Sequence, residues 1–174
     1  MKLRFNNITL RNALPSDAAL LAVWWNDGAV MAHAGFPNGL GISVEEAAGS
    51  IGDGLFIIEE AGKSIGEASC RPLDETTAEI GIKICVFEFQ NRGLGKIALS
   101  LLIKNLFERG FEKIVLDTNL SNLRAQHVYE SLGFKKLRVN VDSWKDQLGT
   151  LQSSVDYELT EKDFIDFIYE KYKN

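Results

Sequence analysis

The chain has 174 residues, of which 45% are hydrophobic and 25% charged, and its net charge is −5. This length suits one domain with a substantial core, and the composition is ordinary for a globular protein. The acidic balance argues against nucleic acid as the main partner. We therefore expect residues 1–174 to form a single domain that binds no nucleic acid.

Neither a membrane nor a metal is expected as a partner. No apolar run approaches the roughly 20 residues that a membrane-spanning helix needs, and the first seven residues turn polar too early for a secretory signal peptide. We expect a cytoplasmic protein. Cys70 and Cys85 both lie in strand-like runs, which favours buried thiols over a disulfide. No Cys and His residues stand at zinc-binding spacing.

The first half of the chain predicts a helical segment followed by a meander of strands. The expected elements are a strand at 8–11, a helix from Pro15 that stops at 26–28, a glycine-rich loop at 31–42, a short helix at 43–50, and strands at 55–58, 64–70 and 78–86. Short turns rich in glycine, proline and aspartate join the last three strands, so we expect them to pair antiparallel.

The pattern changes after residue 86. Apolar residues recur at helical spacing from Ile97 to Leu106. The expected elements after this helix are a strand at 114–116, a helix at 122–132 closed by Gly133, strands at 134–141 and 154–159 with a polar connection between them, and a final helix opened by 160–163. This order predicts a layered α/β domain with a mixed sheet.

The strongest functional signal is the glycine loop that precedes the long helix. It consists of Gln90, Asn91, Arg92, Gly93, Leu94, Gly95 and Lys96. Glycines at a helix start let backbone N–H groups approach a phosphate closely. The loop is not that of a nucleoside-triphosphate P-loop, since Gln90 replaces the first glycine and Ile97 replaces the metal-binding hydroxyl.

A dinucleotide-binding pattern remains an alternative. Gly93, Gly95 and Ala98 match G-x-G-x-x-A, and Asp117 ends the next predicted strand. Two features oppose this interpretation: six residues separate the strand from the first glycine, and the preceding strands are patterned as hairpins.

A second motif follows the loop at a characteristic distance. It reads Asn-x-x-Ala-x-x-x-Tyr-Glu-x-x-Gly-Phe and starts at Asn122. Together with Gln90-x-x-Gly93-x-Gly95, it resembles the GCN5-related N-acetyltransferase (GNAT) superfamily. The first strands and the Trp24-Trp25 helix end resemble the branch that contains ribosomal-protein N-terminal acetyltransferases. The resemblance covers nearly the whole chain, and residues 79–134 are its specific part. It implies a mostly antiparallel sheet of about six or seven strands, splayed in the middle, with helices on both faces.

The resemblance implies acetyl-coenzyme A as cosubstrate. The seven residues of the glycine loop would wrap its pyrophosphate, with Arg92 and Lys96 adding positive charge. Backbone atoms of Ile84, Cys85 and Val86 would contact the pantetheine arm or the thioester carbonyl, while the Cys85 side chain packs and does not react. The cofactor-binding set is completed by Asn119, Asn122 and Ala125. Whether Asn122 caps its helix or bonds the pantetheine arm stays open.

Acetyl transfer to an amine requires proton movement at two places. An amine with a pKa of about 10.4 must lose a proton before it attacks. Glu79 is the predicted base, with Glu67 and Asp117 as fallback carboxylates; the alternative for Glu79 is a solvent-facing residue or an ion pair with Lys83. Tyr129 is predicted to hydrogen-bond the leaving thiolate. A phenol with a pKa of about 10 is a weaker acid than a thiol of about 8.5, so full proton transfer is uphill.

The predicted function is an acetyl-CoA-dependent N-acetyltransferase that works by direct attack within a ternary complex. The acceptor is a primary amine: a protein N-terminus, a polyamine, an aminoglycoside or a small metabolite amine. His33, Trp144 and one of Trp24 and Trp25 are candidates for the acceptor end. A non-catalytic acyl-CoA-binding module and an NAD(P)-dependent oxidoreductase remain alternatives, and the protein is expected to be a monomer or a homodimer.

Overall fold

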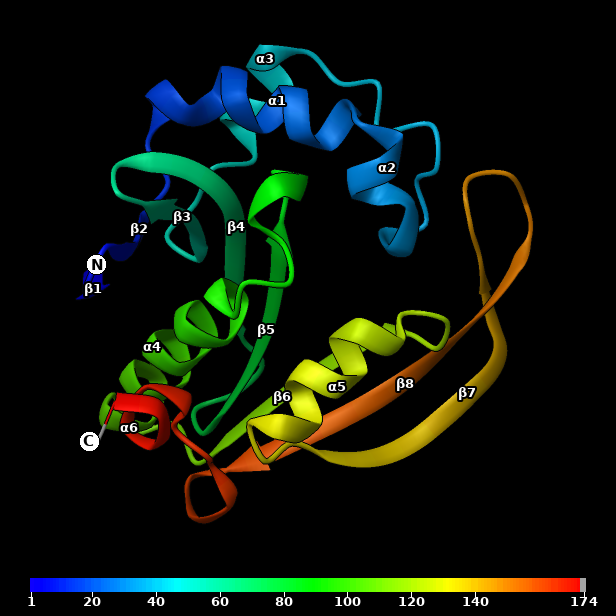
Figure 1. Cartoon of the computed structure of the whole chain (residues 1–174). Coiled ribbons are helices and arrows are strands. Elements are labelled where there is room, and N and C mark those ends of the chain that lie inside the picture. The colour runs from blue at the N-terminus through cyan, green and yellow to red at the C-terminus, as the bar shows by residue number, and fades with distance from the viewer. Residues whose placement is uncertain (173–174) are drawn as a thin grey trace.

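The computed structural model describes residues 1–172 and builds them around one eight-stranded sheet with the order β1-β2-β3-β4-β5-β6-β8-β7 (Figure 1). The strands are β1 (Lys2–Phe5), β2 (Ile8–Asn12), β3 (Leu55–Glu60), β4 (Lys63–Pro72), β5 (Thr77–Ile84), β6 (Lys113–Asn119), β7 (Lys135–Lys145) and β8 (Leu151–Thr160). Neighbouring strands run antiparallel except β5 and β6, which are parallel. The mixed, mostly antiparallel sheet is confirmed, with eight strands instead of six or seven.

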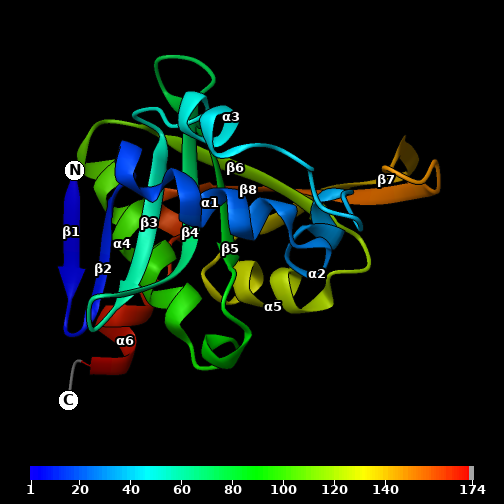
Figure 2. The same ribbon diagram turned by 90° about the horizontal axis from the view of Figure 1, so that it is seen from above.

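Helices cover both faces of this sheet, as predicted (Figures 1 and 2). One face carries α1 (Ala18–Asn26), α2 (Gly28–Met31) and α3 (Val44–Gly49), and the other α4 (Leu94–Glu108), α5 (Leu123–Ser131) and α6 (Phe167–Tyr172). β3 is covered on both sides, since Ile58 packs in the α4 cluster and its neighbour Ile57 in the α1 cluster. None of the helices within residues 1–172 is long and apolar enough to cross a membrane.

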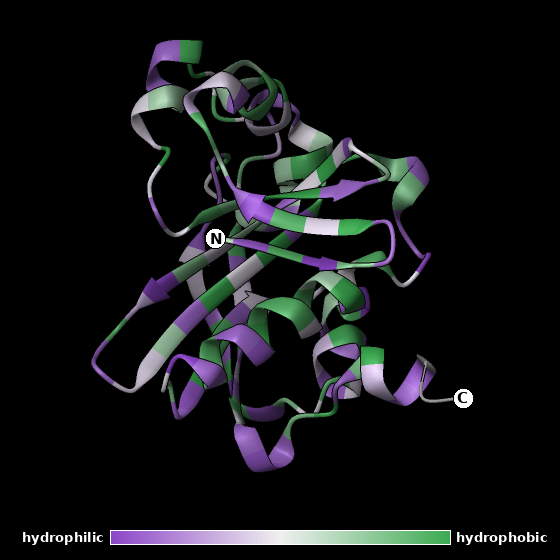
Figure 3. Cartoon of the chain, turned by 90° about the vertical axis from the view of Figure 1, so that its left-hand side faces the viewer, coloured by the Kyte–Doolittle hydropathy of each residue, from purple (hydrophilic) through white to green (hydrophobic). Residues whose placement is uncertain are grey.

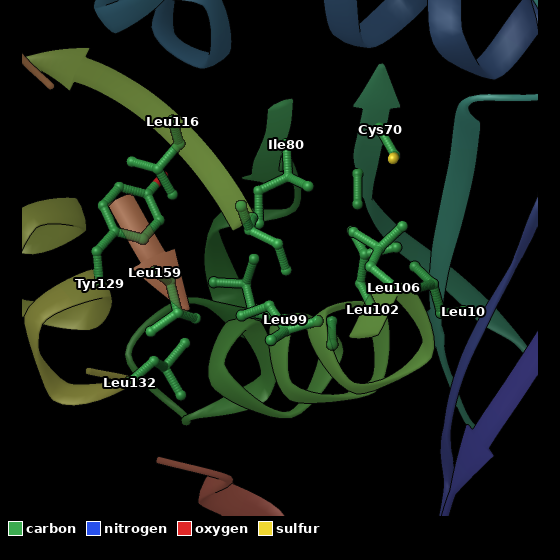
Figure 4. Packing of buried hydrophobic residues seen from close by; sticks show 14 of the residues in the cluster. Leu10, Cys70, Ile80, Leu99, Leu102, Leu106, Leu116, Tyr129, Leu132 and Leu159 are labelled. Carbon is green, nitrogen blue, oxygen red and sulfur yellow. The ribbon is translucent and has the colours of Figure 1, made fainter. Parts of the chain in front are cut away.

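The larger core lies between α4 and the sheet. Leu99, Leu102 and Leu106 project from one side of α4 towards β2, β4 and β5 (Figure 4) and are buried. Burial of each such side chain contributes roughly 1.5–3 kcal/mol to folding. Several strands are hydrophobic along their middle and hydrophilic towards their ends (Figure 3). The long helix is therefore fixed against the sheet by the apolar stripe that predicted it.

The sheet splits between β5 and β6. The two strands pair only where residues 77–79 face residues 113–115. Beyond that point β5 continues beside β4 as far as Ile84, and β6 continues beside β8 as far as Asn119. A wedge therefore opens between β5 and β6, and the predicted splay is confirmed.

A bulge ends β5. The N–H groups of Cys85 and Val86 both donate to the carbonyl of Ile65, at 2.9 and 3.1 Å, so two residues of one strand oppose a single residue of the other. Val86 therefore packs with Cys85 in the α1 cluster. Strict alternation along the strand would place Val86 on the same face as Ile84, and the bulge moves it to the opposite face.

Four element predictions differ from the structure. β1 was not predicted, and residues 31–42 were expected to form a loop throughout. Asp27 accepts hydrogen bonds from Ala29 and Val30, so the chain re-enters a helix at α2 directly after the stop at 26–28. The final helix begins at Phe167 and not at 160–163, where a 3-10 turn stands. β7 and β8 reach further into the polar connection than expected, because the residues that extend them, 142–145 and 151–153, are mostly polar.

Candidate active site

A cleft of about 1000 Å³ occupies the wedge between β5 and β6 and extends beneath α2. Its lining includes most of the predicted cofactor site: Ile84, Gln90, Asn91, Gly93, Leu94, Gly95, Lys96, Asn119, Asn122 and Ala125. Tyr129 also lines it, together with residues from segments 29–34 and 67–69 and Trp144. Cys85, Val86, Arg92 and Glu79 are not among the lining residues. The cleft thus joins the glycine loop to a second region far from it in sequence.

The glycine loop delivers the start of α4 into this cleft. Asn91 (φ 58°) and Gly93 (φ 77°) adopt left-handed backbone conformations, and Gly93 directly precedes the helix. A Cβ on Gly95 would meet only the side chains of Ile82 and Ile84, at 3.8 Å, so the helix start is open on its cleft side. The first N–H groups of a 15-residue helix and its dipole favour an anion at such a place.

Gln90 connects the two sides of the wedge. Its side-chain Nε2 donates to the Ile84 carbonyl at 2.8 Å, and its Oε1 accepts from the Arg124 guanidinium at 2.6 Å. Ile84 belongs to β5 and Arg124 to α5. The glycine loop is thereby tied to both walls of the cleft.

Arg92 points away from the cleft. Its guanidinium pairs with Glu60 at 3.1 Å and lies over the ring of Phe89. The structure therefore gives Arg92 the role of an ion-paired surface residue, whereas Lys96 lines the cleft.

Backbone amides of β5 face the wedge. Successive N–H groups of a strand point to opposite edges, and that of Cys85 points to β4. Those of Ile84 and Ile82 consequently point towards the gap that β6 has left. Ile82 was missed by the sequence analysis, although the parity of the strand could have indicated it. The Cys85 thiol is buried, and desolvation raises its pKa, as expected of a packing residue.

Tyr129 presents its hydroxyl to the cleft. The ring projects from α5 towards Leu116 of β6 (Figure 4), with ring centroids 5.8 Å from Phe134 and 5.9 Å from Tyr157. Burial and the nearby Asp117 carboxylate raise the Tyr129 pKa to about 12. Among the described residues the hydroxyl has no hydrogen-bond partner. It is therefore a protonated donor available to a ligand.

The two asparagines have partners of their own. Asn122 Oδ1 accepts the N–H of Ala125 and caps α5. Asn119 bonds Gln152 through Nδ2 and Ser121 through Oδ1. The Asn122 Nδ2 group has no partner in residues 1–172, so its cap role leaves it able to bond a ligand as well.

Three carboxylates surround the wedge in different states. Glu67 is buried in the cleft wall, where it accepts hydrogen bonds from Trp25 Nε1 at 2.8 Å and Lys83 Nζ at 2.7 Å. Glu79 bonds Arg71 at 2.6 Å. The ion pair between Glu79 and Lys83, one of the open alternatives, is therefore wrong, because Lys83 pairs with Glu67 on the neighbouring strand.

Asp117 lies between the cleft and a smaller recess. The recess has a volume of about 390 Å³, is also lined by Glu79, and shares Ser69, Gly81 and Asp117 with the cleft. Asp117 has no hydrogen-bond donor to its carboxylate among the described side chains. Asp117 is exposed at the surface of the cleft, and its partial desolvation there together with the charges of Glu79 and Asp156 raises its pKa. It is the lining carboxylate best able to accept a proton.

The far end of the cleft is closed by the hairpin of β7 and β8. Gln147 makes three hydrogen bonds to segment 35–39: its N–H donates to the Gly35 carbonyl, its Nε2 to the Gly39 carbonyl, and its Oε1 accepts from Asn38, at 2.8 to 3.0 Å. We call these contacts the clasp. Trp144, which lines the cleft, packs against Gly35, where an added Cβ would lie only 2.5 Å from an atom of the indole ring.

A bulge in β7 directs the Trp144 side chain into the cleft. The β7–β8 register shifts between Asn140 and Trp144, and Asp142 between them has a positive φ of 48°. Such bulges redirect side chains. His33, in the turn after α2, lines the same region. The candidates His33 and Trp144 thus both line the cleft, whereas Trp25 does not line it and only bonds the lining residue Glu67.

The split sheet and a match in sequence assign this chain to one protein family. A sequence profile of the acetyltransferase (GNAT) family matches residues 42–134, more than half of the chain, and the chain belongs to this family. The expected family membership is therefore confirmed. Within residues 1–172, no group of three or more His, Cys, Asp or Glu side chains is placed to hold a metal ion.

Relatives include acetyltransferases with different acceptors. The chain is 31% identical over 88 residues to mycothiol acetyltransferase of Thermomonospora curvata, covering 51% of this chain and 30% of that protein. It is 42% identical over 52 residues to ribosomal protein bS18-alanine N-acetyltransferase of Salmonella typhimurium, covering 30% and 35%. The matched part is about a third of the length of each of these relatives.

Solved structures share the fold over nearly the full chain. RimL, a ribosomal-protein acetyltransferase in complex with coenzyme A, superposes with a TM-score of 0.81 at 16% identity, covering 92% of this chain and 98% of that one. An acetyltransferase from Salmonella typhimurium with its cofactor acetyl-CoA gives 0.73 at 23% identity, covering 89% and 94%.

Proposed function

We propose that this protein transfers the acetyl group of acetyl-CoA to a primary amine by direct attack within a ternary complex. The observation that carries the proposal is the wedge between β5 and β6, with the amides of Ile82 and Ile84 on one wall and the Tyr129 hydroxyl on the other. An anion-binding helix start lies at one end of this wedge. Coenzyme A in RimL and acetyl-CoA in the Salmonella typhimurium neighbour support the choice of cosubstrate.

The wedge has the groups that thioester aminolysis requires. Negative charge develops on the carbonyl oxygen as the amine attacks, and fixed N–H donors stabilise it. We assign this role to the amides of Ile82 and Ile84, since the Cys85 and Val86 amides are used by Ile65. When the C–S bond breaks, the sulfur becomes a thiolate. Tyr129 then donates a hydrogen bond to it without losing its proton, as its raised pKa requires.

Asp117 is the base that the geometry favours. The predicted base Glu79 is held by Arg71 and lies in the adjacent recess, and Glu67 already accepts two hydrogen bonds. Asp117 faces the cleft, and its raised pKa makes it a better proton acceptor. In this proposal Glu79 acts as the neighbouring charge that contributes to the raised pKa, and it remains a candidate for direct proton transfer.

A small amine is the acceptor class that we propose. The clasp and Trp144 cover the end of the cleft opposite the glycine loop, so a folded protein surface has no flat approach there. A small amine, or the first residues of an extended N-terminus, fits such a space. The bS18-alanine N-acetyltransferase relative supports the N-terminal option, and the mycothiol acetyltransferase relative supports the small-molecule option.

Two measurements test the proposal in sequence. Thermal unfolding with acetyl-CoA, coenzyme A, NADH and ATP identifies the ligand, because a ligand at 100 times its Kd adds about 2.7 kcal/mol to the free energy of unfolding. Thiol release from acetyl-CoA is then followed with diamines, aminoglycosides, amino acids and short peptides. Stabilisation by coenzyme A without thiol release for any amine would support the non-catalytic acyl-CoA-binding module. Stabilisation by NADH alone would contradict the proposal.

A further inference from the structure

An ammonium group lies at the acceptor end of the cleft. Among residues 1–172, three Lys or Arg side chains line the cleft: Lys83, Lys96 and Arg124. Lys96 stands in the first turn of α4 and Arg124 bonds Gln90, so both lie at the glycine loop. Lys83 projects from the opposite face of β5, because the residues on either side of it pack in the α4 cluster. Its charge is therefore directed towards the side of the sheet that carries α1 and α2.

Glu67 fixes this ammonium group in the wall of the cleft. Lys83 Nζ donates to Glu67 Oε1 at 2.7 Å, and the other carboxylate oxygen accepts from Trp25 Nε1 at 2.8 Å. The Glu67 side chain is 6% exposed, whereas that of Lys83 is 34% exposed. A lysine ammonium has three N–H donors, and Glu67 is its only acceptor among the described residues. The remaining donors of Lys83 are therefore available to a ligand in the cleft.

The proposed base stands on the opposite wall. Continuing the parallel pairing of Glu79 with Val115 along the two strands brings Gly81 level with Asp117, and these two residues both line the recess. Lys83 lies two residues beyond Gly81, about 6.6 Å further along β5. A molecule whose amine faces Asp117 can therefore present a neighbouring anionic group to Lys83 across the wedge.

The rest of the acceptor end is mostly apolar. Ala29, Val30 and Ala34 line it from one side and the indole of Trp144 from another, with His33 as the titratable group of segment 29–34. An apolar substituent on the acceptor fits against these side chains. The acceptor end thus combines a carboxylate, an ammonium group and an apolar wall.

We propose that the acceptor is a free α-amino acid with an apolar side chain, whose carboxylate binds the Lys83 ammonium while its amine faces Asp117. This inference rests on the proposed function and selects among its acceptors. A peptide N-terminus has an uncharged amide where the amino acid has its carboxylate, and a diamine has a second cation, which Lys83 repels. The products are an N-acetyl amino acid and coenzyme A.

The test compares free amino acids with their carboxamides, which keep the amine and the side chain but lose the negative charge. Thiol release from acetyl-CoA gives kcat/KM for leucine, methionine and phenylalanine, each against its own amide. The variants are Lys83→Met, Lys83→Arg and a control, Lys135→Met, whose natural lysine pairs with Asp163 outside the cleft. A carboxylate makes the neighbouring amine more basic, so without recognition the amide, with more of its amine neutral, would react faster.

We expect the natural protein and the control to prefer at least one acid over its amide by about tenfold or more, which corresponds to about 1.4 kcal/mol. Lys83→Arg should keep this preference. Lys83→Met should lose it through a higher KM for the acid, while kcat/KM for the amide stays the same.

Three outcomes would contradict the inference. If the natural protein acetylates amides or diamines at least as fast as the acids, the inference fails and the proposed function stands, whether or not the variants fold. A preference for the acid that survives in folded Lys83→Met would also overturn it. An absence of thiol release with every amine would instead remove the proposed function and the inference with it.

Discussion

The two ends of the cleft are built on different principles. The cofactor end consists largely of backbone: the loop before α4, the β5 amides and the helix start. The acceptor end consists of side chains from segments more than a hundred residues apart, of which Trp144 and His33 are examples. Backbone geometry at the cofactor end depends on a few glycines, and side-chain geometry at the acceptor end depends on the whole fold. A short sequence motif therefore predicts the cofactor end, whereas no such motif predicts the acceptor end.

The largest effect is expected where a side chain enters the cofactor end. Tyr129→Phe removes the donor to the thiolate, and we expect kcat to fall about 10²-fold, the size typical of losing one transition-state hydrogen bond or acid. The Kd for acetyl-CoA should not change. Tyr157→Phe is the matched control, since its hydroxyl bonds Glu130 outside the cleft. Steady-state kinetics showing equal kcat for the two variants would assign Tyr129 to packing alone.

Asp117→Asn should reduce kcat/KM about tenfold near neutral pH, because the proposed base is lost. In the natural protein, activity should decline as pH falls through the raised pKa of Asp117, since protonation removes the base. A pH–rate profile of the natural protein and the variant checks this. If Glu79→Gln abolishes the acidic limb and Asp117→Asn does not, Glu79 is the base.

The same substitution should change stability in the opposite direction. A folded-state pKa raised above the unfolded value means that the charged carboxylate destabilises the native state at neutral pH. Asp117→Asn should therefore raise Tm at pH 7, and the gain should disappear below about pH 4, where the unfolded chain is protonated too. A variant that is less stable at pH 7 would refute the raised pKa. Thermal unfolding across this pH range provides the measurement.

Gly95→Ala tests the claim that the cofactor end works through bare backbone. Gly95 lies in the first turn of α4, and an added Cβ meets the protein only at 3.8 Å. The helix should gain roughly 0.5–1 kcal/mol from replacing glycine. The methyl group nevertheless occupies the phosphate approach, so the Kd for acetyl-CoA should rise several-fold. Gly49→Ala at the end of α3, where a Cβ meets nothing within 4 Å, should leave the Kd unchanged.

The smallest effect is expected from the clasp. Gln147→Ala removes two side-chain hydrogen bonds to segment 38–39, so the hairpin should hold Trp144 less firmly. We expect the KM for the amine to rise about two- to fivefold, the consequence of losing roughly 0.5–1 kcal/mol of positioning. The Kd for acetyl-CoA should stay constant. Ser143→Ala, on the same hairpin but bonded only to Asn140, should change neither value.

Much of the fold was predictable from periodicity. The meander of β3, β4 and β5 and the helix α4 followed from apolar spacing, and the capped helix α3 from its Ser43 signal. β1 and the last four residues of β7 were not predicted, because β1 is only four residues long and residues 142–145 do not continue the alternation of apolar and polar residues that precedes them. The bulge at Cys85 and Val86 could not be predicted from the sequence either, since it arises from the register of β5 with β4.

The candidate site divides in the same way. The glycine loop and Tyr129 were identified from a motif, whereas Phe167 of α6, which also lines the cleft, has no sequence signal, because α6 reaches the loop only through packing on α4. Arg92 illustrates the reverse case. Its position in the motif indicated a phosphate contact, and only the folded chain reveals that the Arg92 guanidinium forms an ion pair with Glu60.

The close contact between Trp144 and Gly35 makes the residues that can be tolerated at these two distant positions depend on each other. With the tryptophan present, any side chain at position 35 collides with its ring and also requires a left-handed backbone. Once residue 144 is small, position 35 loses the steric part of that restriction. Substitutions at residue 35 should therefore be tolerated better in a background where residue 144 is small than in the natural sequence.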